Sequence, residues 1–350
     1  MKVITLAACA MALATSLSAA PVDLSNYFSS FVAIGDSLSD DGKLGGTPFE
    51  NGPPSLEGRF SNGITAVENI AQDFGFAADL AIGGATARIQ NENPLPPQFG
   101  TFAGQVATLG GIAADPFGRA ALGDRPLFSV LIGNNDILQN IGFPDGATAP
   151  GNVLPGIGAL AADAVEANIR AIKAIDTEFN DFVVFNLPDL TLTPLFTNPV
   201  FGTAPFAPLA AQEVAGFNTQ ISANIAALRA DGINIIEFDL NAVFKELLGE
   251  AVANGININD PCSFDLSNQN PLATCAFSPG SPNDTDITLA DAFFFIDPIH
   301  PNRVAQAAVA DRFRDVVAAS EVAPVPLPAG LPLLIAGLAG FGVLRIRRAA

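Results

Sequence analysis

The feature that most constrains this chain is an alternation of short apolar runs with helical patterns between residues 30 and 319. Uninterrupted apolar runs are typical of strands buried on both faces, as in a parallel sheet. Parallel strands need crossover connections, which helices supply. The alternation therefore predicts an α/β fold, a three-layer sandwich whose five-stranded parallel sheet has helices on both faces. The expected strands are 31–34, 77–82, 127–132, 182–185 and 233–238.

Between the expected strands, apolar residues recur at helical spacing in three stretches, 66–74, 214–228 and 305–317. We expect the last helix to begin at Pro301, because proline suits the first turn of a helix. With no internal repeat or linker, residues 30–319 are predicted to form one domain. Four connections are too long for plain turns and are typical of loops around a site: 91–100, 139–158, 190–208 and 255–292.

Charge and composition exclude several classes of function. Lys and Arg total 16 against 35 Asp and Glu, and a chain with a net charge of −19 is a poor binder of nucleic acid. The 3 cysteines and single histidine exclude zinc fingers and any metal site that needs two imidazoles. We therefore expect no nucleic-acid partner and no metal site of these kinds.

Both ends of the chain predict export. Residues 1–20 have the features of a secretory signal peptide. A Pro-rich linker at 320–328 precedes the segment 329–350, which is apolar up to Leu344 and then rich in arginine. This segment resembles the VPLPA variant of the PEP-CTERM class of bacterial sorting tails, which implies that export machinery and a sorting-tail protease act on it. The alternative is a retained transmembrane anchor; in both cases the domain faces the periplasm, cell surface or exterior.

Export to an oxidising compartment affects which state we expect for the cysteines. Cys9 leaves with the signal peptide, whereas Cys262 and Cys275 remain in a loop rich in Pro, Asn and Ser. In an oxidising compartment such a pair is more typical of a disulfide than of two free thiols, the alternative. We expect a structural disulfide.

The only histidine and an early serine are candidates for catalysis. His300 follows Asp297 by three residues in a Pro-flanked turn, so the carboxylate can hold the imidazole in one tautomer. Ser37 follows the first expected strand, at the carboxyl end where parallel sheets place their sites. The plainer alternatives are a structural Asp–His pair and a helix-capping serine. The chain has no Gly-x-Ser-x-Gly turn, which disfavours an ordinary α/β-hydrolase.

Two other turns can supply donors to a developing oxyanion. Gly83 and Gly84 bring bare backbone N–H groups to the end of one expected strand. The sequence Gly-Asn-Asn-Asp at 133–136 brings a side-chain amide to the end of another. The alternatives here are a tight turn and a helix cap.

The four turns together are more specific than any one of them. Gly-Asp-Ser-Leu-Ser at 35–39, Ala-x-Gly-Gly-Ala at 81–85, Gly-x-Asn-Asp at 133–136 and Asp-x-x-His-Pro at 297–301 occur in this order. They resemble the GDSL esterase/lipase family of the SGNH hydrolase superfamily, over about residues 31–318.

That resemblance implies a flavodoxin-like sheet and a serine hydrolase that needs no cofactor. It makes Ser37 the nucleophile, His300 the base and Asp297 the residue that orients the base. It also assigns the oxyanion hole to the backbone N–H groups of Ser37 and Gly84 and the side-chain amide of Asn135.

The expected function is therefore a secreted serine esterase or lipase that cleaves carboxylic esters of lipids, acylated small molecules or polysaccharides through an acyl-enzyme. A carbohydrate O-acetylesterase acting on surface or extracellular polysaccharide is the main alternative, which the sorting tail keeps open. A non-catalytic surface protein would have no reason to keep all the motif residues. Calcium binding at Asn283, Asp284 and Asp286 is a further alternative, although loop carboxylates in an acidic chain are usually just solvated.

Overall fold

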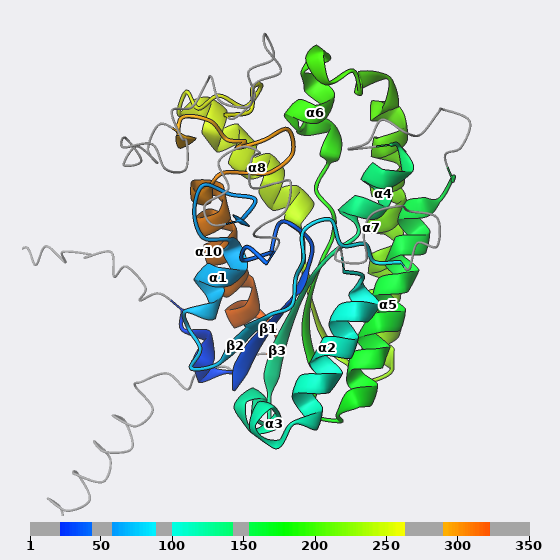
Figure 1. The fold of residues 1–350 in the computed structure, drawn as a ribbon, viewed down its shortest axis with the longest axis vertical. Coiled ribbons are helices and arrows are strands. Elements are labelled where there is room, and N and C mark those ends of the chain that lie inside the picture. Colours follow the sequence, from blue (N-terminus) through cyan, green and yellow to red (C-terminus); the bar gives the residue numbers. More distant parts are fainter. Residues whose placement is uncertain (1–21, 44–57, 89–99, 143–153, 263–289, 323–350) are drawn as a thin grey trace, which may run out of the picture.

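The computed structural model describes residues 22–43, 58–88, 100–142, 154–262 and 290–322. Within these ranges one parallel sheet has the strand order β2-β1-β3-β4-β5 (Figure 1). This is the flavodoxin-like order, and it confirms the predicted fold class. The strands are β1 (Ser30–Gly35), β2 (Ala77–Asp79), β3 (Pro126–Leu131), β4 (Asp181–Phe185) and β5 (Asn234–Phe238).

Four of the strands lie within one residue of their predicted bounds, and β2 is the exception. It ends at Asp79 rather than at Ile82. The N–H groups of Leu80 and Ile82 still donate to carbonyls of β1, at 2.8 and 3.2 Å. The apolar run therefore continues along β1 after regular pairing has stopped, which is why the sequence predicts a longer strand.

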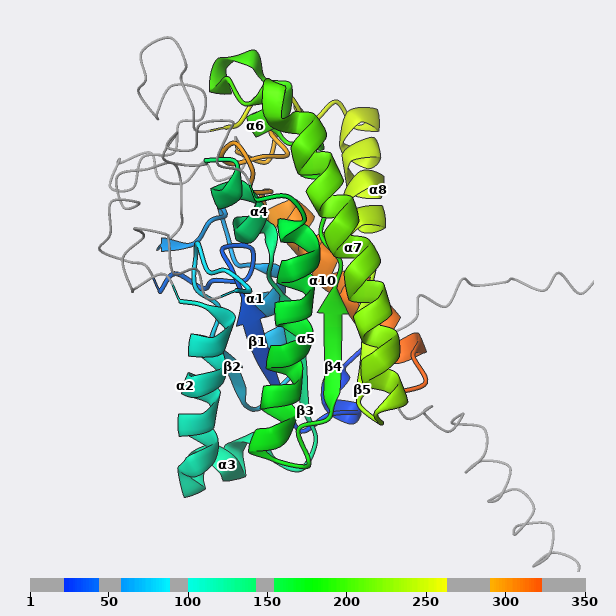
Figure 2. The ribbon, with the colours of Figure 1, turned by 90° about the vertical axis from the view of Figure 1, so that its right-hand side faces the viewer.

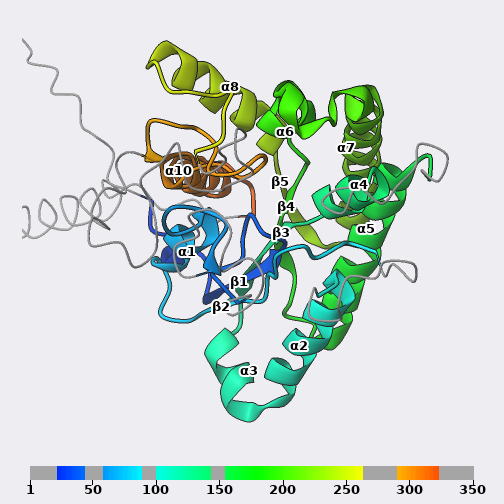
Figure 3. The same ribbon diagram turned by 45° about the horizontal axis from the view of Figure 1, so that its top comes forward.

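Helices cover both faces of the sheet (Figure 3). On one face lie α1 (Ala66–Ala71) and α10 (Arg303–Ala319), with α8 (Leu240–Ala253) packed beside α10. The opposite face carries α2 (Phe102–Ala114), α5 (Ile157–Ile175) and α7 (Ala207–Ala230), which run side by side in Figure 2. The shorter helices are η1 (Leu24–Asn26), α3 (Pro116–Leu122), α4 (Asn134–Asn140), η4 (Leu190–Leu192), α6 (Pro194–Thr197), η5 (Pro199–Phe201) and η6 (Ala204–Phe206).

Two sequence predictions about helices need correction. The last helix begins at Arg303 and not at Pro301, because the side chain of Asn302 caps it. Helix α1 ends at Ala71, so Phe74 lies beyond it, although its ring stacks on Phe31 at 5.7 Å. The connection at 190–208, predicted to be too long for a plain turn, contains the short helices η4, α6, η5 and η6.

Phenylalanine rings pack on both faces of the sheet. The ring of Phe313 on α10 lies 6.2 Å from Phe31 of β1 and 5.9 Å from Phe185 of β4. On the other face, Phe128 of β3 stacks on its register neighbour Phe182 of β4 at 5.0 Å. Side chains alternate along a strand, so each face of the sheet has its own aromatic layer.

No helix within the described ranges is long and apolar enough to cross a membrane. The predicted signal peptide at 1–20 and tail at 329–350 lie outside the described residues, as does most of the linker at 320–328. These three remain predictions.

Candidate active site

The candidate site lies where the strand order changes direction, between the carboxyl ends of β1 and β3. This is the usual place for a ligand in an open α/β sheet. Gly35 and Leu131 are register partners at these two ends. Ser37 follows β1 by two residues and is 7% exposed, and Asn135 stands in the first turn of α4. The turns that carry Ser37 and Asn135 therefore start side by side.

Ser37 and His300 are 263 residues apart in the chain, yet Ser37 Oγ lies 2.6 Å from His300 Nε2. On the other side of the ring, His300 Nδ1 lies 2.5 Å from Asp297 Oδ2. The structure thus joins the three residues in one chain of hydrogen bonds. This order, hydroxyl to imidazole to carboxylate, is the one that allows a serine to lose its proton to a base.

Asp297 is held as a carboxylate. Burial alone would raise its pKa, but the charge and hydrogen bond of His300 and the N–H groups of Ile299 and His300 bring the pKa below the usual 3.8. These two N–H groups donate to Asp297 Oδ1 at 2.9 and 2.8 Å. An ionised carboxylate facing Nδ1 favours the tautomer that carries its proton there. Nε2 is then free to accept from Ser37.

The two turns expected to form the rest of an oxyanion hole lie against each other. Asn135 Nδ2 donates to the carbonyl of Ala85 at 3.0 Å. Gly84 has φ +77° and Gly133 has φ +131°, conformations that favour glycine. At Gly133 a Cβ atom would also lie 2.6 Å from the ring of Phe217. Asn135 lines the same pocket as Ser37, whereas Gly84 is not among the described residues that do.

Two buried side chains with no role in the sequence prediction hold these turns in place. Asp40 Oδ2 accepts the N–H of Gly83 at 2.6 Å, so the turn after β1 is tied to the turn after β2. Gln105 of α2 exchanges two hydrogen bonds with Gly35, at 2.9 and 2.8 Å. Asp40 follows the Gly-Asp-Ser-Leu-Ser motif directly, which is a signal that could have been used, whereas Gln105 stands in no motif.

Asp136 ties the third turn to the second. Its Oδ2 accepts from Ala87 N at 2.7 Å and its Oδ1 from Arg88 N at 3.2 Å. Burial raises the pKa of Asp136 to about 7. The aspartate of the Gly-x-Asn-Asp motif thus positions the backbone after Gly84, while the asparagine before it faces the pocket.

The segment that carries Asp297 and His300 is fastened to α10 by Asn302. Asn302 Oδ1 accepts from Ala305 N at 2.9 Å, and Asn302 Nδ2 donates to the carbonyl of Phe293 at 2.7 Å. The position of the imidazole therefore depends on the start of this helix. The same cap explains why the helix begins after Pro301.

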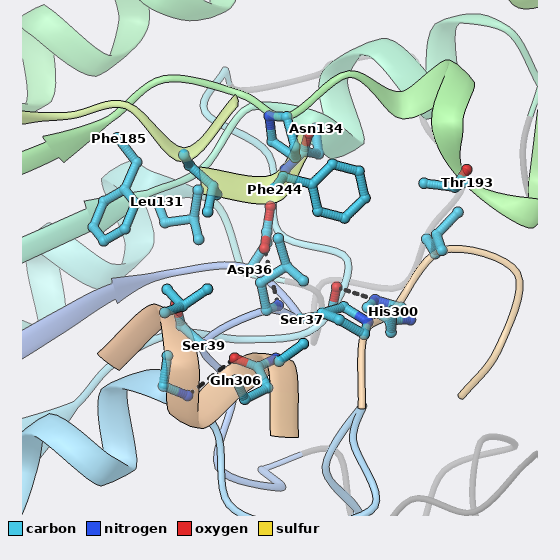
Figure 4. A pocket seen from close by; sticks show the side chains of 18 of the residues that line it. Asp36, Ser37, Ser39, Leu131, Asn134, Phe185, Thr193, Phe244, His300 and Gln306 are labelled. Carbon is cyan, nitrogen blue, oxygen red and sulfur yellow. Dashed lines mark hydrogen bonds between the residues drawn. The ribbon is translucent and has the colours of Figure 1, made fainter. Parts of the chain in front are cut away.

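A largely hydrocarbon pocket extends from Ser37 toward α1, α8 and α10 (Figure 4). The pocket is large enough to hold several water molecules. Among the apolar side chains that line it are Val67, Leu131, Phe185, Phe244, Phe294 and Val309.

The model of the family GDSL-like Lipase/Acylhydrolase matches residues 31–313 of this chain. The chain belongs to this family. Its curated relatives include the thermolabile hemolysin of Vibrio parahaemolyticus, 27% identical over 80% of this chain and 62% of that protein. The Esterase EstA of Pseudomonas aeruginosa is 26% identical, over 87% of this chain and 49% of that protein. The chain thus spans about half to three fifths of the length of these two relatives.

Two further matches extend over most of the other protein's length. The phosphatidylcholine-sterol acyltransferase of Aeromonas hydrophila is 24% identical over 85% of this chain and 92% of that protein. Among solved structures, the lipase Lip_vut3 from a goat rumen metagenome is 15% identical, with a TM-score of 0.43, over 84% of this chain and 99% of that one.

In this GDSL-like chain, Cys262 is fully buried and disulfide-bonded. Its expected partner Cys275 lies outside the described residues, as do Asn283, Asp284 and Asp286, the alternative calcium ligands. Disulfide formation at Cys262 agrees with the prediction, and the pairing with Cys275 remains a prediction.

Proposed function

We propose that this chain is a serine ester hydrolase that cleaves carboxylic esters through an acyl-enzyme. The observation that carries the proposal is the hydrogen-bond chain from Ser37 through His300 to Asp297. Membership of the GDSL-like lipase/acylhydrolase family supports it. The relatives named as an esterase and as a phosphatidylcholine-sterol acyltransferase support an ester as the substrate.

In the first half of the reaction, Ser37 Oγ attacks the ester carbonyl carbon while His300 Nε2 takes the hydroxyl proton. Asp297 stabilises the imidazolium that results. The tetrahedral intermediate then breaks its bond to the alcohol oxygen, which leaves with the proton from Nε2. Ser37 remains as an ester of the acyl group.

In the second half, water attacks the acyl-enzyme. His300 removes a proton from the water and returns it to Ser37 Oγ, which releases the carboxylic acid. In both halves the carbonyl oxygen gains negative charge, and we assign its stabilisation to the N–H groups of Ser37 and Gly84 and to Asn135 Nδ2. Fixed donors of this kind each contribute about 3 kcal/mol.

The pocket favours a hydrocarbon acyl group over acetyl. An acetyl group has only a methyl beyond its carbonyl and would leave most of the apolar lining without contact. A longer chain gains roughly 0.8 kcal/mol for each CH₂ group that it buries. This argues for esterase or lipase activity rather than for the O-acetylesterase alternative.

We also propose that the domain works outside the cytoplasm and that the tail at 329–350 is removed by a membrane protease. The predicted signal peptide and sorting tail support this, and so does the disulfide at Cys262, because disulfides persist in oxidising compartments.

The test uses an organophosphonate label and nitrophenyl esters from acetyl to palmitoyl. The wild type should take up one label and hydrolyse medium-chain esters faster than acetate. Ser37→Ala should lose labelling and activity, and His300→Ala should lose about as much activity, because its serine keeps its proton. Ser25→Ala, which changes an exposed serine in η1, is the control and should be labelled like the wild type. Wild-type turnover by Ser37→Ala would overturn the proposal.

A further inference from the structure

The segment 58–63, Gly-Arg-Phe-Ser-Asn-Gly, contacts both halves of the candidate site but has no part in the reaction steps above. Its two glycines are packed too closely on their neighbours to accept a side chain without displacing them. A Cβ atom at Gly58 would lie 2.8 Å from the carbonyl oxygen of Gly42, in the turn that carries the nucleophile. A Cβ atom at Gly63 would lie 2.7 Å from Cβ of Arg303, the first residue of α10. The segment therefore reaches from the turn of the nucleophile to the helix that follows the base.

Polar contacts hold the middle of this segment from both sides. Asn62 is fully buried, and its Oδ1 accepts the N–H of Arg303 at 2.7 Å. This N–H group is among the first of α10, which have no partner within the helix. On the other side, the Arg59 guanidinium donates to the Glu68 carboxylate at 2.7 Å, and Glu68 belongs to the capping box of α1. The backbone at Phe60 is thus fixed between α1 and α10.

The half-buried ring of Phe60 packs on the imidazole of His300. The two ring centroids are 4.9 Å apart and the ring planes are inclined by 42°, a distance typical of aromatic rings in contact. Ser37 and Asp297 hydrogen-bond to the two ring nitrogens, so both act in the plane of the imidazole. Hydrogen bonds made in the plane resist tilting of the ring only weakly, whereas a bulky side chain at this distance blocks it.

Phe60 touches the base but not the acyl pocket. It is not among the described residues that line the pocket beside Ser37, whereas His300 is. We propose that Phe60 is a positioning residue, which keeps the imidazole of His300 aligned between the hydroxyl and the carboxylate that it joins during both proton transfers. This proposal rests on the proposed function and names a further residue on which its base depends. Such a role should appear in kcat and leave KM unchanged, because no contact with the acyl chain is lost.

The first test compares the kinetics of Phe60→Ala and Phe60→Leu on nitrophenyl esters, with active sites counted by organophosphonate titration. Phe60→Ala should lower kcat roughly tenfold, because a small displacement of a catalytic group is costly. Its KM and preferred chain length should not change. Phe60→Leu refills most of the space and should restore most of the lost kcat. If Phe60→Ala does not fold, Phe60→Val makes the same comparison with a smaller loss of contact.

The matched control is Phe74→Ala. It removes another half-buried ring, which stacks on Phe31 at 5.7 Å near the amino end of β1, away from the site. This control should lose stability and keep the wild-type kcat, so that the loss of a packed ring is separated from the loss of this particular contact.

The second test observes the imidazole directly by nuclear magnetic resonance. His300 is the only histidine of the chain, so the ring signals of ¹⁵N-histidine-labelled protein made without a histidine tag can be assigned at once. The Nδ1 proton that faces Asp297 should give a sharp low-field signal in the wild type, in Phe60→Leu and in Phe74→Ala. In Phe60→Ala this signal should broaden, because a tilting ring exposes the proton to exchange with water.

Either a wild-type kcat or a wild-type imidazole signal in Phe60→Ala would overturn this inference and leave the proposed hydrolase standing. A higher KM or a changed chain-length preference at constant kcat would also overturn it, because Phe60 would then bind substrate. A wild type that hydrolyses no ester would overturn the proposed function instead, and the imidazole signal would still test the contact between Phe60 and His300.

Discussion

At the scale of single residues, replacing Asn135 should affect the catalytic rate differently from replacing Ser37 or His300. Its side-chain amide is assigned to the charged transition state, whereas the other two perform the proton transfer. Asn135→Ala should therefore lower kcat by roughly 10²-fold with little change in KM. Steady-state kinetics and the rate of organophosphonate labelling measure this. Labelling should be slower yet reach completion, and a rise in KM at constant kcat would contradict the role.

Asp36 makes a prediction about stability and pH. Its pKa is raised from 3.8 in the unfolded chain to about 6 in the fold, so between these values the folded protein keeps a proton that the unfolded chain releases. The stabilising contribution is complete below pH 3.8 and is lost as pH rises through about 6. Asp36→Asn lacks this loss. Its free energy of unfolding should gain on the wild type by about 1.4 kcal/mol per pH unit across this window.

Urea unfolding of Asp36→Asn and the wild type at pH 4, 5, 6 and 7 measures this difference. The total gain should reach roughly 3 kcal/mol above pH 6. A difference that stays constant from pH 4 to pH 7 would show that Asp36 titrates normally in the fold.

The sequence predicted the residues with distinctive chemistry and missed those that act through position. Ser37, Asp297 and His300 stand in motifs whose order implied a shared site, and the structure joins them by hydrogen bonds. Gln105 stands in no motif, and a glutamine on a helix gives no sign in the sequence of what it will contact. Its role depends on hydrogen bonds with Gly35, 70 residues away in the chain.

At the scale of elements, the cap of α10 should affect both stability and catalysis. Asn302→Ala removes the acceptor for Ala305 N and the bond to Phe293, beside the turn that carries His300. It should cost about 1–2 kcal/mol of stability and also lower kcat per folded molecule. Asp115→Ala is the matched control, because it removes the cap of α3 far from the site.

Thermal unfolding and active-site titration separate the two effects. Asp115→Ala should lose stability with kcat unchanged. If Asn302→Ala behaved in the same way, the helix cap would have no part in positioning the imidazole.

The sequence predicted whether each element is a strand or a helix better than it predicted the residues at which each element ends. Continuous apolar runs gave the buried strands, since strands of a parallel sheet are covered on both faces. The predicted end of β2 and the predicted start of α10 were wrong, because each boundary is set by local hydrogen bonds that the apolar pattern does not show. Pro301 suits the first turn of a helix, but the side chain of Asn302 accepts the N–H of Ala305 and so makes Asn302 the N-cap, one residue later.

At the scale of the whole molecule, the site joins the two ends of the domain. Ser37 follows the first strand, and His300 precedes the last helix. The ring of Phe313 on α10 packs on Phe31 of β1, so the helix that follows His300 is anchored on the strand that precedes Ser37. Motif order could predict that these ends meet, but only packing sets the 2.6 Å between Ser37 Oγ and His300 Nε2.

The disulfide at Cys262 acts on this same closure. Cys262 packs on Ala290 and Ile296, and its N–H donates to the carbonyl of Phe295 at 2.9 Å, within the segment that leads to His300. Exchanging both Cys262 and its expected partner Cys275 for serine should lower the free energy of unfolding by up to about 3 kcal/mol. The kcat of the folded protein should hold, because the backbone bond from residue 262 does not need sulfur.

Thermal unfolding with and without dithiothreitol provides the measurement and its control together. The reductant should lower the Tm of the wild type to that of the double variant, and it should leave the double variant unchanged. A wild-type Tm that does not respond to complete reduction would mean that packing of residues 290–296 alone holds the segment. The disulfide would then have no part in keeping His300 over Ser37.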